Sequence, residues 1–235
     1  MNKKTGFILL HGSGLGSYIW DRVTPLLNAP FLCVDFPNRG KKGKPNENLS
    51  FDDYVKHAYK AIDKREFESF VLVTHSISGF IAMDIGREYA AQISGIIGVA
   101  SVFPAKKNSF VQSLPFPQKL IMPLVLKLSG TRPPDAAIKK GLGNSLSGED
   151  ITMIVDRFTA ESPSLFTTPV ENYMLQVNRL YVKTTDDMEF PMSIQEKMAN
   201  NLKAETTEIK TGHLPMLSEP QKIALLLNDF IDVVE

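Results

Sequence analysis

The sequence has little of what marks several classes of protein. Among its 235 residues Cys33 is the single cysteine, so an internal disulfide or a metal site with several cysteine ligands is excluded. Lys and Arg together number 26, as do Asp and Glu, so the chain as a whole has no electrostatic reason to bind a nucleic-acid backbone or an anionic membrane. The most apolar internal stretch, 120–128, contains Pro123 and Lys127 and falls far short of the roughly 20 residues that cross a bilayer.

The beginning of the sequence has no pattern of a secretory signal. Four apolar residues at 7–10 follow Lys3 and Lys4, whereas a signal peptide has an apolar segment of about 7–15 residues. Cys33 lies in the apolar run 31–34, and a free cysteine is typically buried. We therefore expect a soluble cytoplasmic protein with a buried, reduced thiol and no membrane insertion.

Short apolar runs alternate with longer segments of helical period, in a chain whose composition is that of an ordinary globular protein. The runs predict strands at 7–10, 31–34, 70–73, 96–99, 180–182 and, more weakly, 204–209. The periodic segments predict helices at 18–27, 51–64, 77–90, 192–201 and 220–234. This alternation predicts an α/β fold, a mostly parallel, doubly wound sheet of about six strands with helices on both faces.

The alternation lapses between residues 104 and 178. This segment is rich in Pro, Ser and Lys, and its apolar residues recur at helical spacing. It predicts a helical cap over the carboxyl edge of the sheet, where open α/β sheets bind ligands. Helices packed on the flank of the sheet, without a role in binding, are the alternative. The predicted organisation is a core (1–103), a cap insertion (104–178) and the rest of the core (179–235).

A glycine-rich stretch, 11–16, follows the first predicted strand. One interpretation is a dinucleotide-binding loop, because Asp35 follows Gly14 by about 20 residues, although Ser17 stands where a third glycine is expected. The other is a loop whose N–H groups stabilise an oxyanion. The second interpretation needs a nucleophile elsewhere in the chain.

Ser76 supplies a candidate nucleophile. It stands between a predicted strand and a predicted helix, with the small residues Thr74 and Ser78 two positions away on either side. This pattern is typical of a nucleophile elbow, a sharp turn that holds a serine over the edge of the sheet. The usual pattern has glycine at both flanking positions, so a simple helix N-cap is the alternative.

A serine hydroxyl needs a base, and histidine suits that task at neutral pH. His213 follows the last predicted strand and so belongs at the same sheet edge as Ser76. We predict that His213 is the base. The other histidines are assigned other places: His57 on a helix surface, His75 pointing away from Ser76, and His11 ordering the glycine loop.

A carboxylate must then fix the tautomer of the imidazole. Asp186 and Asp187 both follow the predicted strand 180–182. The order Ser, Asp, His is the order found in one of the three unrelated scaffolds that build such a triad.

Taken together, the segment after the first strand, the elbow, the acid loop and the closing segment 211–220 resemble the α/β-hydrolase family over most of the chain. The resemblance implies the α/β-hydrolase fold with a helical cap. It favours Asp187 as the acid, because family acids commonly lie four residues before a helix-opening proline, here Pro191. It implies that the backbone N–H groups of Ser13 and Ile77 form the oxyanion hole, and that neither a metal nor an organic cofactor is needed.

Within that family, the acid loop is similar to the small branch of plant-type methylesterases and hydroxynitrile lyases. The lyases have threonine after the first histidine and lysine after the last, whereas Gly12 and Leu214 stand here, so cyanohydrin cleavage is not expected. The family's two opening antiparallel strands have no counterpart before residue 7, which implies a compact member.

The resulting expectation is a serine hydrolase of a small ester or related acyl compound, with no nucleic-acid partner. Lactonase, thioesterase and acyltransferase activities are alternatives on the same fold. A ligand-binding receptor or pseudoenzyme is another, and a nicotinamide-dependent oxidoreductase is a third.

Three further groups of residues carry expectations of their own. Cap residues 114–125 are expected either to line an acyl pocket or to form the core of the cap. Asp35 and Asp84 are expected to be structural, and Lys41, Lys42 and Lys44 to lie in a solvated loop.

Overall fold

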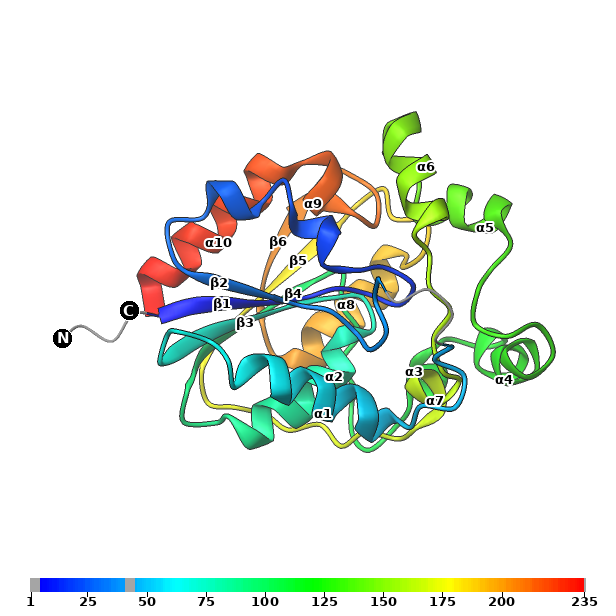
Figure 1. Ribbon diagram of the computed structural model, residues 1–235, viewed down its shortest axis with the longest axis horizontal. Coiled ribbons are helices and arrows are strands. Elements are labelled where there is room, and N and C mark those ends of the chain that lie inside the picture. The colour runs from blue at the N-terminus through cyan, green and yellow to red at the C-terminus, as the bar shows by residue number, and fades with distance from the viewer. Residues whose placement is uncertain (1–4, 41–44, 235) are drawn as a thin grey trace.

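A single parallel sheet organises the computed structural model, which describes residues 5–40 and 45–234 (Figure 1). Within these ranges the sheet has six strands in the order β2-β1-β3-β4-β5-β6, and every neighbouring pair is parallel. The strands are β1 (Thr5–Leu10), β2 (Phe31–Val34), β3 (Ser69–His75), β4 (Ile93–Val99), β5 (Asn178–Thr184) and β6 (Glu205–Ile209). The predicted doubly wound α/β fold is confirmed. The lysines at 41, 42 and 44 lie outside the described residues.

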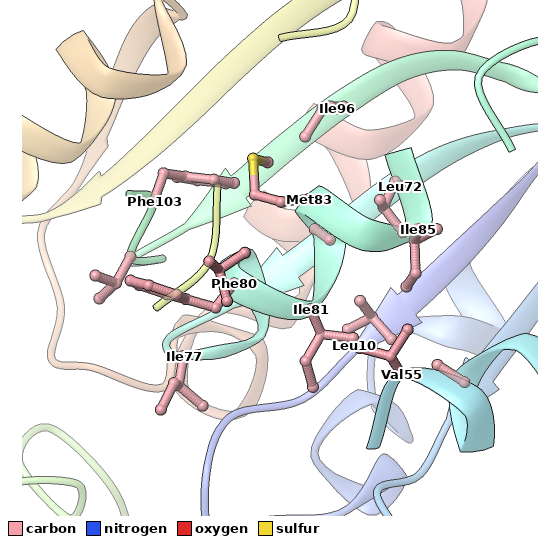
Figure 2. Packing of buried hydrophobic residues seen from close by; sticks show 14 of the residues in the cluster. Leu10, Val55, Leu72, Ile77, Phe80, Ile81, Met83, Ile85, Ile96 and Phe103 are labelled. Carbon is pink, nitrogen blue, oxygen red and sulfur yellow. The ribbon is translucent and has the colours of Figure 1, made fainter. Parts of the chain in front are cut away.

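Helices cover both faces of the sheet. One face carries α1 (Phe51–Ile62), α2 (Ser78–Glu88) and α8 (Met192–Leu202), and the other carries the short α9 (Pro215–Ser218) and the long α10 (Pro220–Val234). Side chains from strands β1 to β5 enter both apolar clusters, on opposite faces of the sheet, as a pleated strand requires. Figure 2 shows the first cluster, in which Ile81 of α2 lies near Leu10 of β1 and Val55 of α1. The strands are thereby fixed with their carboxyl ends at one edge.

Two local predictions are wrong. The expected helix at 18–27 is a pair of 3-10 helices, η1 (Ser17–Trp20) and η2 (Thr24–Leu26). Pro25 has no N–H to donate to the carbonyl four residues before it, which disfavours one continuous α-helix across this segment. Cys33 is only partly buried, because β2 is an edge strand, although that burial raises the pKa of its thiol to about 12.

The insertion between β4 and β5 is helical, as predicted. Its helices are α3 (Phe110–Ser113), α4 (Gln118–Ser129), α5 (Asp135–Lys140), α6 (Gly148–Asp156) and α7 (Ser164–Thr167). The helices α4, α5 and α6 lie beyond the carboxyl ends of the strands, whereas α3 and α7 extend the layer formed by α1 and α2. In the described part of the chain no helix combines the length and apolar content that crossing a bilayer requires.

Candidate active site

Ser76 occupies a strained turn between β3 and α2. Its φ is 56°, in the left-handed region that non-glycine residues rarely adopt. It is partly exposed, while His75 and Ile77 on either side are buried. Helix α2 begins at Ser78 with Ile77 as its N-cap, so Ser76 is not the helix cap of the alternative prediction. The turn instead presents the Ser76 side chain at the edge of the sheet, as an elbow does.

The two residues that depart from the glycine pattern stabilise this turn. The Ser78 hydroxyl donates to the carbonyl of His75 at 2.8 Å and accepts the N–H of the same residue at 2.9 Å. The Thr74 hydroxyl donates to the hydroxyl of Ser101 at 2.9 Å, which in turn donates to the carbonyl of Ser76 at 2.9 Å. Glycine would allow this turn through its conformational freedom. Thr74 and Ser78 instead stabilise the strained backbone through hydrogen bonds.

Gly79 in the first turn of α2 has no room for a side chain. A Cβ there would lie 2.4 Å from the carbonyl oxygen of Val102 and 2.8 Å from the Ser101 hydroxyl. We expect Gly79→Ala to lower the free energy of unfolding by about 1–3 kcal/mol, the usual cost of overpacking, when measured by urea denaturation. The control is Gly86→Ala on the same helix, where the nearest atom would be at 3.4 Å. That variant should keep or gain stability because alanine is the better helix former, and an equal loss in both would contradict the prediction.

Asp187 and His213 form a buried pair at the ends of the two strands β5 and β6. The Nδ1 of His213 lies 2.7 Å from Oδ2 of Asp187, and both side chains are almost fully buried. Asp187 is itself held, because Oδ2 accepts the Thr184 hydroxyl at 2.8 Å while Oδ1 accepts the N–H groups of Glu189 and Phe190 at 2.7 and 2.8 Å. The pair fixes the ring of His213 through Nδ1 and leaves Nε2 for another partner.

The neighbouring Asp186 does not take this place. Its side chain is exposed, and its backbone N–H donates to the carbonyl of Thr211. The aspartate that contacts His213 is therefore Asp187, the one that the resemblance favoured.

The pair shifts both pKa values in opposite directions. Burial by itself lowers the pKa of His213, but the charge and hydrogen bond of Asp187, together with the charge of Glu189, outweigh burial and raise it above 6.5. Burial raises the pKa of Asp187, but the charge and hydrogen bonds around the carboxylate outweigh it and lower the pKa below 3.8. Asp187 is thus ionised and His213 can gain a proton near neutral pH.

The remaining histidines have supporting positions. His11 places Nδ1 2.8 Å from the carbonyl of Gly12 and accepts the N–H of Phe36 on Nε2 at 2.9 Å, so it orders the glycine loop. The ring of His75 packs against that of His213 at 4.7 Å, and burial lowers its pKa to about 3. His75 is therefore a neutral packing residue behind His213, a contact that the sequence did not indicate. His57 is exposed.

The glycine loop lies directly against the elbow. A Cβ on Gly12 would be 2.8 Å from the Cβ of Ser76, so glycine is required for this approach. No hydrogen bond among the described residues uses the N–H of Ser13 or of Ile77. Both groups are thus available to a ligand beside Ser76.

The same loop does not fit a dinucleotide. The N–H of Gly14 donates to the Glu161 carboxylate at 3.1 Å, where a pyrophosphate would have to approach. Asp35, which would bind the ribose, accepts the N–H and hydroxyl of Ser17 at 2.6 and 3.1 Å. These contacts give Asp35 the structural role predicted for it. They favour the oxyanion interpretation of the loop over the nicotinamide-dependent one.

A cavity of about 470 Å³ brings these groups together under the insertion. Ser13, Ser76, Ile77 and His213 line one part of it. Most of the other lining residues are apolar, and many come from α4, α5 and the segments around them. They include Met122, Val125, Leu126, Pro133, Pro134, Ile138, Leu142 and Phe158. Among the described residues, no cluster of three His, Cys, Asp or Glu side chains is arranged to hold a metal ion.

The apolar residues at 114–125 neither all line the cavity nor all form a core of the cap. Met122 and Val125 line the cavity, and Leu114 packs against the core cluster. The four others, Phe116, Leu120, Ile121 and Leu124, are more than half exposed, on the outer side of the insertion. Sequence reasoning also missed other lining residues, Glu189 and Phe158 among them, although Glu189 stands close to the predicted acid.

The sequence pattern of the Alpha/beta hydrolase family matches residues 7–224, and the chain belongs to this family. Among its relatives is norfluorocurarine synthase 1 from Strychnos sp, which is 24% identical over 97% of this chain and 96% of the relative. Methylesterase 7 from Arabidopsis thaliana is also 24% identical, over 98% of both chains. An extracellular α/β-hydrolase from a Paenibacillus species has a similar fold, with a TM-score of 0.81 at 18% identity over 96% of this chain and 98% of that one. The predicted relationship to the plant methylesterase branch is confirmed.

Proposed function

We propose that this protein is a serine hydrolase that cleaves an ester through Ser76, His213 and Asp187. The observation that carries the proposal is the Asp187-bound His213 lining the same cavity as Ser76 in its left-handed turn. The relationship to a methylesterase supports ester cleavage. Because another relative is named a synthase, the family alone does not determine the reaction, and the proposal rests on the site.

In the proposed reaction, His213 Nε2 takes the proton of the Ser76 hydroxyl as its oxygen attacks the ester carbonyl. The N–H groups of Ser13 and Ile77 donate to the oxyanion of the tetrahedral intermediate. When the intermediate collapses, the C–O bond to the alcohol breaks and His213 gives its proton to the departing oxygen. A water molecule then attacks the acyl-enzyme with His213 again as base, which releases the acid and restores Ser76.

The lining of the cavity supports a proposal for the class of substrate. Its walls are largely apolar, so burying an acyl or alcohol group of matching size is favourable by roughly 25 cal/mol per Å² of apolar surface. A volume of about 470 Å³ is typical of a site for a small molecule. We therefore propose small, uncharged acyl esters as substrates.

The test combines a fluorophosphonate probe with a panel of acyl esters, lactones and thioesters. We expect covalent labelling at Ser76 and the highest turnover with esters, since only an activated serine reacts with the probe. A protein that binds the esters without labelling or turnover would be a receptor and would overturn the proposal. Preference for a lactone or a thioester would keep the triad and overturn the substrate class.

The pH dependence follows from His213. The base must be neutral, so kcat/KM for an ester is expected to fall as the pH decreases through the raised pKa of His213, with a midpoint above 6.5. Glu189→Gln should move this midpoint to lower pH because it removes one of the charges that raise the pKa. The measurement is a profile from pH 5 to 9 on both proteins. A wild-type midpoint at or below 6.5 would contradict the prediction.

A further inference from the structure

One short segment of the insertion, residues 158–161 after α6, holds Gly14 on three sides. Glu161 accepts the N–H of Gly14 on Oε1 at 3.1 Å, and the N–H of Thr159 donates to the carbonyl of Gly14 at 2.9 Å. The ring of Phe158 covers the Cα so closely that a Cβ would lie 2.2 Å from it. With a φ of +77°, Gly14 has the left-handed conformation that glycine adopts most easily. Both polar backbone groups of this residue are thus bound by the insertion.

The Glu161 carboxylate is fixed by a buried network. Arg39 pairs with Oε1, and its Nε donates to the carbonyl of Leu15 at 2.5 Å. The second oxygen, Oε2, accepts Asn46 Nδ2 at 3.2 Å and the Tyr54 hydroxyl at 3.0 Å. Glu161 is 1% exposed, so its hydrogen bonds form in a low-dielectric environment where a satisfied network is rigid. Such a carboxylate can hold a backbone N–H in one orientation.

The loop that carries the proposed oxyanion donor is therefore held at both ends by different parts of the molecule. On one side, Gly12 is fixed by the hydrogen bond from His11 and by its packing against Ser76. On the other side, Gly14 is fixed by Glu161. Ser13 is the single residue between them, so the direction of its N–H depends on both attachments.

We propose that Glu161 is a positioning residue for the oxyanion hole, acting through the N–H of Gly14 to hold Ser13. This inference rests on the proposed function, because it assigns a role to the Ser13 N–H. The insertion then does more than line the cavity, since the oxyanion site is complete only when residues 158–161 are docked on the glycine loop.

The test compares Glu161→Gln with Asp150→Asn. Asp150 is also a buried carboxylate of the insertion, and it also pairs with a core arginine, since Arg22 donates to it at 2.7 and 3.0 Å. None of its hydrogen bonds involves the loop 11–16. Each substitution removes one charge from a pair between insertion and core with little change of shape.

We expect Glu161→Gln to lower kcat for a nitrophenyl ester by about 10–100-fold, somewhat less than the roughly 10²–10³-fold cost of removing an oxyanion donor outright. Its KM and the acid midpoint of its pH profile should stay close to the wild-type values, since the cavity and the His213–Asp187 pair are untouched. Asp150→Asn should retain wild-type kcat. Both variants can lose thermal stability, so melting temperature is measured alongside.

A second measurement is independent of catalysis. Hydrogen exchange of the amides in peptides covering 11–16 should be faster in Glu161→Gln and unchanged in Asp150→Asn. If Glu161→Gln does not fold, Glu161→Asp is compared with Asp150→Glu in the same assays. Equal kcat and equal exchange in the two members of a pair would overturn the inference. If the wild-type protein were not labelled by the probe, the proposed function would be overturned instead. The hydrogen-exchange comparison could still be interpreted, because it does not depend on catalysis.

Discussion

Ser76→Ala is expected to lower ester turnover by about 10⁴–10⁶-fold, the range seen when a member of a triad is removed. The variant loses the oxygen that would become acylated, while His213, Asp187 and the free N–H groups of Ser13 and Ile77 remain in place. Rate enhancement that remains would come from binding and the oxyanion hole alone. The measurement is kcat/KM for the best ester of the panel, together with probe labelling and the melting temperature.

The matched control is Ser129→Ala. Ser129 lies at the end of α4 and lines the same cavity, but no step of the proposed reaction uses its hydroxyl. The Ser129→Ala variant should be labelled at Ser76 and should turn over esters within a few-fold of the wild type. If Ser76→Ala kept wild-type turnover, the proposed nucleophile would be wrong, whatever the identity of the substrate.

The second large effect is expected for Asp187→Asn, with a loss of about 10⁴-fold in kcat. Oδ2 of Asp187 now accepts a hydrogen bond from the His213 ring and from the Thr184 hydroxyl. An amide NH₂ at this position would donate to Nδ1 and place the ring proton on Nε2, where His213 can no longer accept a proton from Ser76. The pKa of His213 should also fall, because the charge that raises it is gone.

The adjacent aspartate gives the control for this substitution. Asp186 is exposed, and its carboxylate accepts only the Thr185 hydroxyl, at 3.3 Å, among the described contacts. Asp186→Asn should therefore keep kcat and the pH profile of the wild type. A large loss in Asp186→Asn with a small loss in Asp187→Asn would show that Asp186, and not Asp187, is the acid.

The sheet could be predicted because its central strands β1, β3 and β4 are mostly apolar on both faces. Runs such as 7–10 and 70–73 are unbroken by polar residues, since helices cover them on both sides. The same topology places the ends of β3, β5 and β6 at one edge, which is why Ser76, Asp187 and His213 could be grouped from their positions in the sequence. From the residues alone, either Asp186 or Asp187 could be the acid. The hydrogen bond of His213 to Asp187 distinguishes them.

The errors come from features that depend on tertiary contacts or local backbone restrictions. The apolar residues at 18–27 favour one helix, but Pro25 lacks the N–H that a continuous α-helix would need there. The outer residues of α4 have the helical spacing of a buried face, yet Leu120 and Leu124 are exposed, because only one side of this helix faces the cavity. The contact between Glu161 and Gly14 joins residues far apart in the chain, and nothing in the local pattern around either indicates it.

The place of the insertion along the chain also has a consequence for biosynthesis. The ribosome completes β1 to β4, with Ser76 among them, before it makes the insertion and only then β5 and β6. Until those two strands emerge, the edge of β4 has no neighbour, and such an edge invites pairing with other chains. A nascent polypeptide that stops before β5 carries the proposed nucleophile without the proposed base or acid, so the proposed activity would arise only in the final stage of synthesis.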